Sequence, residues 1–242
     1  MAGVSVLCVL QARTSSSRLP GKVLKPILGA PMLARQVERI RRSRRVDALA
    51  VATSSERSDD AVAQLCQGIA VDCYRGSLSD VLDRVYRTAA RYETRHVIRL
   101  TGDCPLTDPA LLDALVELHL SGAYDYSSNV QDRTYPDGLD AEIFTIELLE
   151  RTWREAKSPF EREHVTPYMY QAAASVRRGS LERQPDRSGL RWTVDYPEDF
   201  QFVSRVFEAL YPENPAFDTD DVLRLLEVHP EIAALNANRV TL

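Results

Sequence analysis

The chain has 242 residues, a length that suits one large domain or one domain with a small appendage. An apolar content of 44% and a charged content of 27% are ordinary for a globular protein with a sizeable core. The formal net charge of −5 argues against broad nucleic-acid binding, which needs a basic face or stripe. The apolar opening lacks the basic start of a secretion signal, and no stretch reaches membrane-spanning length. We therefore expect a cytoplasmic protein without nucleic-acid or membrane partners.

Short apolar runs alternate with amphipathic helical patterns through the first 120 residues. The continuous apolar run Val4–Leu10 predicts a strand that is buried on both faces. Further strands are predicted at Ala48–Thr53, Ile69–Tyr74 and His96–Leu100. Helices are predicted to begin near Pro31, Ser58, Ser79 (as the cap) and Pro109. Repeated β-α units of this length imply a mostly parallel sheet with right-handed crossovers.

The pattern changes after about residue 120. Strands are predicted at Tyr124–Val130, Leu139–Phe144 and Leu190–Val194. A helix is expected between the last two of these strands, and the tail from Pro197 is expected to be helical. Because the sequence shows no repeat, low-complexity segment or clear linker, we expect one α/β domain over residues 1–242 with a mixed sheet edge.

The cysteines bear on the type of site. Cys8, Cys66, Cys73 and Cys104 form no CxxC pair, and most of them lie in apolar runs. Buried free thiols are therefore expected in place of disulfides or zinc ligands.

A basic loop follows the first predicted strand. The segment Gln11–Ile27, QARTSSSRLPGKVLKPI, contains Arg13, Arg18, Lys22 and Lys25, in a chain with only one other lysine. Neither GxxxxGK[ST] nor GxGxxG is present in it. Serines and a glycine nevertheless let backbone N–H groups approach an anion, while arginine and lysine supply charge. The loop is thus either a phosphate site or a solvated, positively charged surface loop.

Two aspartates lie at predicted strand ends. Asp103, in LTGDCPL, follows the fourth strand, and Asp195, in RWTVDYPEDF, follows the last one. Ligands of open parallel sheets bind at the carboxyl ends of the strands, where the basic loop also lies. Magnesium prefers one or two carboxylates together with phosphate oxygens and water. Either aspartate alone is better explained as a helix cap, but with the loop the pair favours a Mg²⁺-nucleotide site.

The segment QARTSSSRLPGKVL resembles the signature loop of the nucleotidyltransferases related to CMP-Kdo and CMP-sialic acid synthetases. The closer resemblance is to the spore-coat-polysaccharide (SpsF-like) cytidylyltransferase branch. It continues in order through VATS, YRGSLSDVLDRVY, RLTGDCPL, DGLDAEIF, EREHVTPYMY and RWTVDYPEDF, to about residue 200. The chain departs from the family at Ser15, where glycine is common. If that position requires a positive φ, serine would strain the loop by about 1 kcal/mol or more.

The resemblance implies a Rossmann-like, GT-A-type nucleotidyltransferase fold, with a mixed, mostly parallel sheet flanked by helices and a small acceptor and dimerisation subregion. Residues 1–120 would form the nucleotide-binding half, 121–200 the acceptor and metal half, and 201–242 a helical tail. The implied reaction is transfer of CMP from CTP to a small acceptor, with Mg²⁺ and with release of pyrophosphate. The acceptor is open among sugar acids, sugar or polyol phosphates and phosphonates, and a homodimer is expected.

Site residues follow from the same resemblance, position by position. The expected catalytic residues are Arg13, Lys22 and Asp103. The expected nucleotide contacts are Leu10, Gln11, Ala12, Arg13, Arg18, Lys22, Thr53, Ser54, Arg75, Thr101 and Asp103. The expected metal ligands are Asp103 and Asp195. The expected acceptor contacts are Asp137, Asp140, Glu142 and His164.

His164 is the leading candidate for a general base, although a lone histidine in a helix is more often a hydrogen-bonded structural residue. A hydroxyl acceptor would need a base or a metal, whereas a phosphate or phosphonate is already an anion. The absence of an unmistakable base favours an anionic acceptor. Two other functions stay open. A glycosyltransferase would be expected to carry Asp-x-Asp after a strand, where LTGDCPL has a single aspartate. A non-catalytic nucleotide-binding regulator would bind CTP without releasing pyrophosphate.

Overall fold

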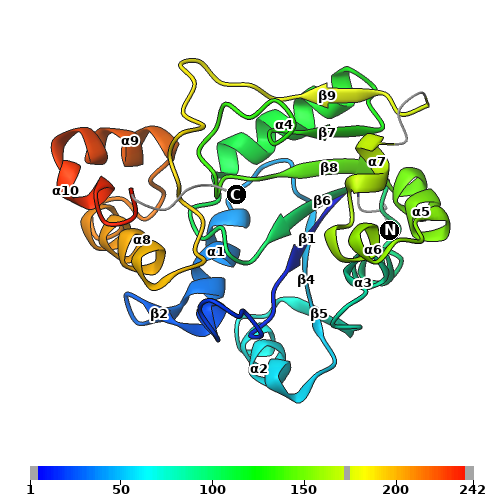
Figure 1. The fold of residues 1–242 in the computed structure, drawn as a ribbon, viewed down its shortest axis with the longest axis horizontal. Coiled ribbons are helices and arrows are strands. Elements are labelled where there is room, and N and C mark those ends of the chain that lie inside the picture. The colour runs from blue at the N-terminus through cyan, green and yellow to red at the C-terminus, as the bar shows by residue number, and fades with distance from the viewer. Residues whose placement is uncertain (1–4, 172–174, 238–242) are drawn as a thin grey trace.

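Strand β1 (Val6–Gln11) lies inside a seven-stranded sheet in the computed structural model, which describes residues 5–171 and 175–237 (Figure 1). The strand order is β5-β4-β1-β6-β8-β7-β9. The other strands are β4 (Ala48–Ser54), β5 (Asp72–Gly76), β6 (His96–Thr101), β7 (Tyr126–Ser128), β8 (Glu142–Thr145) and β9 (Arg178–Ser180). The first four strands of this order are parallel, and β8 runs antiparallel to both of its neighbours. The mixed, mostly parallel sheet is thus confirmed. Val4, the first residue of the predicted strand, lies outside the described residues.

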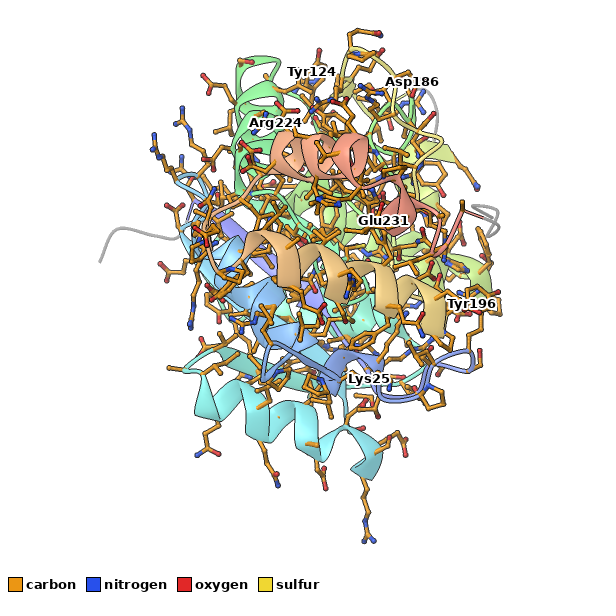
Figure 2. The ribbon with its side chains drawn as sticks, turned by 90° about the vertical axis from the view of Figure 1, so that its left-hand side faces the viewer. Lys25, Tyr124, Asp186, Tyr196, Arg224 and Glu231 are labelled. Carbon is orange, nitrogen blue, oxygen red and sulfur yellow. The ribbon has the colours of Figure 1, made fainter. Side chains whose placement is uncertain are left out.

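Side chains alternate along each buried strand, so the sheet has an apolar face on each side. Helices cover both faces. Val6, Cys8 and Leu10 of β1 face one cluster of apolar side chains, and Leu7 and Val9 face the other. The first face is covered by α1 (Met32–Ile40), α2 (Asp60–Gly68), α4 (Pro109–Ser121), α8 (Pro197–Leu210), α9 (Thr219–Val228) and α10 (Pro230–Ala233). The second face is covered by α3 (Val81–Ala89), α5 (Ile146–Glu155) and α7 (Pro167–Gln171), with α6 (Pro159–His164) against α3. Figure 2 looks from the side on which α8 and α9 lie.

Four sequence predictions need correction. The third strand begins at Asp72, not Ile69, because α2 extends to Gly68 and a turn follows, with Ala70 at φ 51°. The segment Leu190–Val194 is not a strand; it makes only one isolated bridge, from Arg191 to Asp137. Strand β9 lies at Arg178–Ser180, where none was predicted. Finally, Asp80 caps α3 in place of Ser79, since its side chain accepts from the backbone N–H of Asp83.

The remaining elements agree with the sequence to within a few residues. The tail from Pro197 is helical as far as the structure describes it. The four cysteines are free, and Cys73 alone among them is partly exposed. Among the described helices, none is both long and apolar enough to cross a membrane.

A histidine pair lies at the amino end of β6. The fully buried His119 of α4 places Nε2 3.1 Å from Nδ1 of His96, and its Nδ1 lies 3.0 Å from Oγ of Ser127. Burial, and secondarily the neighbouring His96, lower the pKa of His119 to about 4. Burial also lowers the pKa of His96.

This pair predicts a loss of stability in mild acid. Below the ordinary histidine pKa of 6.5, His119 binds a proton in the unfolded chain but stays neutral in the folded chain. The free energy of unfolding therefore falls as the pH drops from 6.5 towards about 4. We expect His119 to account for about 3 kcal/mol of this loss. Urea unfolding at a series of pH values measures it, and His119→Gln should flatten the profile in this window. An unchanged profile in that variant would contradict the assignment.

Candidate active site

The basic loop and the carboxylates meet at the carboxyl ends of β1 and β6. Gly102 N donates to Gln11 O at 2.8 Å, and Val194 N donates to Asp103 O at 2.8 Å. The segment around Asp195 is not a strand, but this bond places it beside the carboxyl end of β6. A cavity of about 410 Å³, called here the first cavity, opens over this edge. It is lined by residues 11–13, 15–18, 22, 23, 81, 84, 99, 101–103, 163, 164 and 195.

Backbone hydrogen bonds within the basic loop contribute to its shape. Thr14 O accepts from the N–H groups of Ser16 at 2.9 Å and Gly21 at 2.8 Å. Gly21 has φ 70°, a conformation that favours glycine, and leads into the short helix η1 (Lys22–Leu24). Ser15 is not among the non-glycine residues with positive φ in the described part of the chain. The strain foreseen for serine at this position therefore does not arise.

Lys22 joins the two predicted metal carboxylates. Its side chain is largely buried, and Nζ lies 3.3 Å from Oδ2 of Asp103 and 3.0 Å from Oδ1 of Asp195. Nζ also donates to Val194 O at 2.6 Å. The ammonium group thus lies between both carboxylates.

Asp195 is held by two further cations. Arg18 and Arg191 each approach one of its carboxylate oxygens at 3.0 Å. Burial favours the neutral acid, but the charge of Lys22 and the hydrogen bonds from Lys22 and Arg191 outweigh it, so the pKa of Asp195 lies below its usual range. Asp195 is therefore ionised at neutral pH.

Arg191 fixes the position of Asp195 through a buried network. Its guanidinium contacts Asp137 and Asp199 at 3.1 Å each, and Asp199 accepts from Asp195 N at 2.9 Å. The turn at Asp137 packs directly on the 191–193 segment, with Thr193 N donating to Asp137 O at 2.9 Å. The rigidity of Asp195 thus depends on this close approach of two backbones.

Gly138 makes the approach possible, since it has φ 110° and a Cβ there would lie 2.2 Å from Thr193 N. Gly138→Ala should therefore lower the free energy of unfolding by at least about 2 kcal/mol and lower turnover by displacing Asp195. Urea unfolding and steady-state kinetics measure both effects. Gly189→Ala is the matched control, because a Cβ there meets nothing within 4 Å. Equal behaviour of the two variants would refute the prediction.

The carboxylate pair fits a divalent cation that also binds phosphate. Asp103 and Asp195 offer the hard oxygen ligands that Mg²⁺ prefers. The described residues contain no group of three or more His, Cys, Asp or Glu side chains that could hold a metal ion. A metal at this pair would therefore take its other ligands from phosphate oxygens and water.

The predicted acceptor residues surround two further cavities. The second cavity, of about 430 Å³, is lined by Asp137 and Asp140 together with Asp103 and Asp195. The third cavity, of about 440 Å³, is lined by Asp140 and Glu142. Each of these acids already has partners. Asp140 accepts a two-pronged ion pair from Arg133 at 2.6 and 2.8 Å, and Glu142 accepts from Arg99 and from Tyr126.

His164 lines all three cavities. Its ring packs on Phe160 with centroids 4.5 Å apart, and its side chain has no hydrogen bond to the described residues. The imidazole thus lies exposed where the three cavities meet, and its predicted contact with an acceptor stays a prediction.

Four other predicted nucleotide contacts do not line the first cavity. Leu10, Thr53 and Ser54 are fully buried, and neither these residues nor Arg75 line the first cavity. Arg75 donates to the backbone oxygens of Ser54 and Glu56 at 3.0 and 2.9 Å and pairs with an aspartate of α2. Their contact with a nucleotide stays a prediction, whereas Gln11, Ala12 and Thr101 do line the cavity.

Two arginines that line the first cavity were not predicted as site residues. Arg84 of α3 is almost fully buried and donates to Ser77 O, while its Nε lacks a partner in the described structure. Burial and the nearby charge of Arg13 lower the pKa of Arg84 to about 10. Arg99 of β6 donates from Nε to Oε1 of Gln11 at 3.0 Å. A charged residue inside the apolar run HVIRL was the available signal for Arg99.

Comparison with known proteins identifies the family and the fold. The cytidylyltransferase family model matches residues 7–217. The chain is 34% identical over 238 residues to the spore coat polysaccharide biosynthesis protein SpsF of Bacillus subtilis, covering 94% of this chain and 96% of that protein. It resembles a cytidylyltransferase structure from Leptospira borgpetersenii with a TM-score of 0.91, at 31% identity over 99% of both chains. A CMP:2-keto-3-deoxy-manno-octonic acid synthetase complexed with CTP shares the fold, with a TM-score of 0.65 and 21% identity over 84% of this chain and 98% of that one.

Proposed function

The chain belongs to the cytidylyltransferase family, and we propose that it transfers CMP from CTP to a small acidic acceptor with release of pyrophosphate. The candidate acceptors are sugar acids, sugar or polyol phosphates, and phosphonates. The observation that carries the proposal is the contact of Lys22 with both Asp103 and Asp195, beside a cavity lined by the basic loop.

Cations of the loop would bind the triphosphate. Arg13, Arg18 and Lys22 all line the first cavity, so their charges are available to the β- and γ-phosphates. Arginine suits phosphate through paired N–H groups, and lysine acts as a compact point charge. As the bond to the α-phosphate breaks, negative charge moves onto pyrophosphate, and these fixed cations stabilise it.

Asp103 and Asp195 would hold the divalent metal, for which we propose Mg²⁺. When bound, the metal supplies Lewis-acid stabilisation of charge on the phosphate oxygens. Lys22 must then give up its contacts with the two carboxylates. The triphosphate offers its ammonium group a new anionic partner within the same cavity, so the positive charge stays balanced.

The acceptor would approach from the second and third cavities. His164, Thr101 and the carboxyl end of β6 lie between them and the first cavity. A phosphate or phosphonate acceptor attacks as an anion and needs no base. A hydroxyl acceptor must lose its proton, and His164 would be the base that removes it. Most of the rate enhancement comes from positioning and charge neutralisation in either case.

The test is pyrophosphate release with CTP, UTP, ATP and GTP against panels of the three acceptor classes. We expect release with CTP and one class, with a product heavier than the acceptor by the mass of CMP. CTP binding without release across the panel would favour a nucleotide-binding regulator. Transfer of a sugar from a nucleotide sugar would favour a glycosyltransferase. Absence of nucleotide binding would refute the assignment of the first cavity. The predicted homodimer is tested separately by light scattering.

A further inference from the structure

Asp59 is a fully buried carboxylate just behind the basic loop. Its Oδ1 accepts from Thr14 N at 2.7 Å and from Thr14 Oγ1 at 2.8 Å. Its Oδ2 accepts from the backbone N–H and the hydroxyl of Ser54, at the end of β4. Four donors from two separate segments of the chain therefore converge on one side chain.

Helix capping does not explain this arrangement. Asp59 stands at the N-cap position of α2, where an aspartate normally accepts from the first turn of its own helix. Its side chain makes no such bond and reaches across 45 residues of sequence to Thr14 instead. Helix α2 thus lacks the side-chain hydrogen bond of an N-cap, and the carboxylate binds the loop instead.

The hydrogen bonds keep Asp59 charged. Burial favours the neutral acid, but the bonds from Ser54 and Thr14 outweigh burial and lower the pKa of Asp59 below its ordinary value. An ionised carboxylate only accepts hydrogen bonds, which matches surroundings made of donors.

Thr14 links Asp59 to the rest of the basic loop by hydrogen bonds. Its N–H and hydroxyl are held by Asp59, and its carbonyl accepts from the N–H groups of Ser16 and Gly21. Gly21 directly precedes Lys22, whose ammonium group contacts Asp103 and Asp195. A continuous set of hydrogen bonds therefore runs from Asp59 through Thr14 to the residue before Lys22.

We propose that Asp59 is a positioning residue that holds the basic loop in the conformation that receives the triphosphate of CTP. The inference rests on the proposed function. Because Asp59 does not line the first cavity, it acts through Thr14 and Ser54 and not by touching the nucleotide. Its loss should weaken nucleotide binding without removing any charge from the cavity wall.

Asp59→Asn is the decisive variant. Asparagine has almost the same volume, but its amide can accept on one side only and must present N–H groups to the donors on the other. We expect CTP affinity, measured by titration calorimetry, to fall roughly 10- to 100-fold, as a displaced binding loop would cause. Tryptic cleavage after Arg13 and Arg18 should also become faster, because the loop is no longer held.

Asp47→Asn is the matched control. Asp47 also accepts two backbone N–H groups across the fold, from Ser5 at 3.0 Å and Val6 at 2.9 Å, but it does so beside the start of β1. The Asp47→Asn substitution should lower the free energy of unfolding without changing CTP affinity or tryptic cleavage of the loop. A merely structural role for Asp59 would make the two variants alike in both measurements, and that result would overturn the inference.

Thr14→Val provides a graded test. It removes the hydroxyl that binds Asp59 and keeps the backbone bond, so CTP affinity should fall by less than in Asp59→Asn. If Asp59→Asn does not fold, Thr14→Val decides, and wild-type affinity with wild-type proteolysis would refute the inference. Wild-type protein that binds no CTP would refute the proposed function instead, which keeps the two failures separate.

Discussion

Asp103→Ala is expected to lower turnover by roughly 10²- to 10⁴-fold, by analogy with the loss of one electrostatic stabiliser from an active site. Asp103 is one of the two carboxylates that share Lys22, and it lies two residues beyond the end of β6 at the wall of the first cavity. Its loss would remove a proposed metal ligand and leave Lys22 paired to Asp195 alone. Steady-state pyrophosphate release by the purified, folded variant measures the effect.

Asp113→Ala is a suitable control for this experiment. Asp113 lies on α4 and accepts from Ser43 Oγ and from the backbone N–H groups of Arg44 and Arg45, away from the three cavities. This variant should keep normal turnover with reduced stability. Near-normal turnover of Asp103→Ala would remove Asp103 from the catalytic set.

Lys22→Met should have two effects of different sign. Turnover should fall by roughly 10²- to 10⁴-fold, since the cation that stabilises departing pyrophosphate is gone. Affinity of the nucleotide-free protein for Mn²⁺ should rise by about tenfold or more, because two carboxylates then face each other without the ammonium group between them. Steady-state kinetics measures the first effect, and electron paramagnetic resonance of free Mn²⁺ measures the second.

Lys25→Met is the control for Lys22. Lys25, labelled in Figure 2, lies three residues along the same loop, and its Nζ sits 5.4 Å from the ring centre of Phe200 on α8. It does not line the first cavity. Removing its charge should leave turnover and Mn²⁺ affinity unchanged. The role of Lys22 would be refuted if both lysine variants behaved alike.

The sheet was predictable where burial dominates the sequence. Strands β1 and β4 read as apolar runs, because parallel strands in a covered sheet are buried on both faces. The apolar run of β6 was also recognisable, although Arg99 interrupts it. Leu190–Val194 also carries three large apolar residues, but its backbone bonds to the turns at Asp103 and Asp137 in place of a neighbouring strand. Apolar content alone cannot separate these cases. Strand β9, with the sequence Arg-Gly-Ser, carries no apolar residue and leaves no such signal.

The site was predictable to the extent that charge and strand ends reveal it. The basic loop and Asp103 meet because the carboxyl ends of the parallel strands β1 and β6 share one edge of the sheet. Asp195 does not follow a strand, and it is brought to the same edge by the hydrogen bond from Val194 N to Asp103 O. Arg84 was missed because it lies in an amphipathic helical pattern, where arginine is usually a surface residue. Asp59 lies where the sequence predicts the start of a helix, and an acid at such a position is ordinarily explained by the helix dipole. Its contact with Thr14 joins segments that only the folded chain brings together.

The most direct test of cytidylyl transfer follows the phosphorus atoms of CTP. Parallel reactions with the accepting compound class would use CTP labelled at the α- or at the γ-phosphate. The account predicts that the α label enters the product and that the γ label leaves in pyrophosphate. The γ label in the product, or in free orthophosphate alone, would contradict it, because the bond broken would then lie between the β- and γ-phosphates.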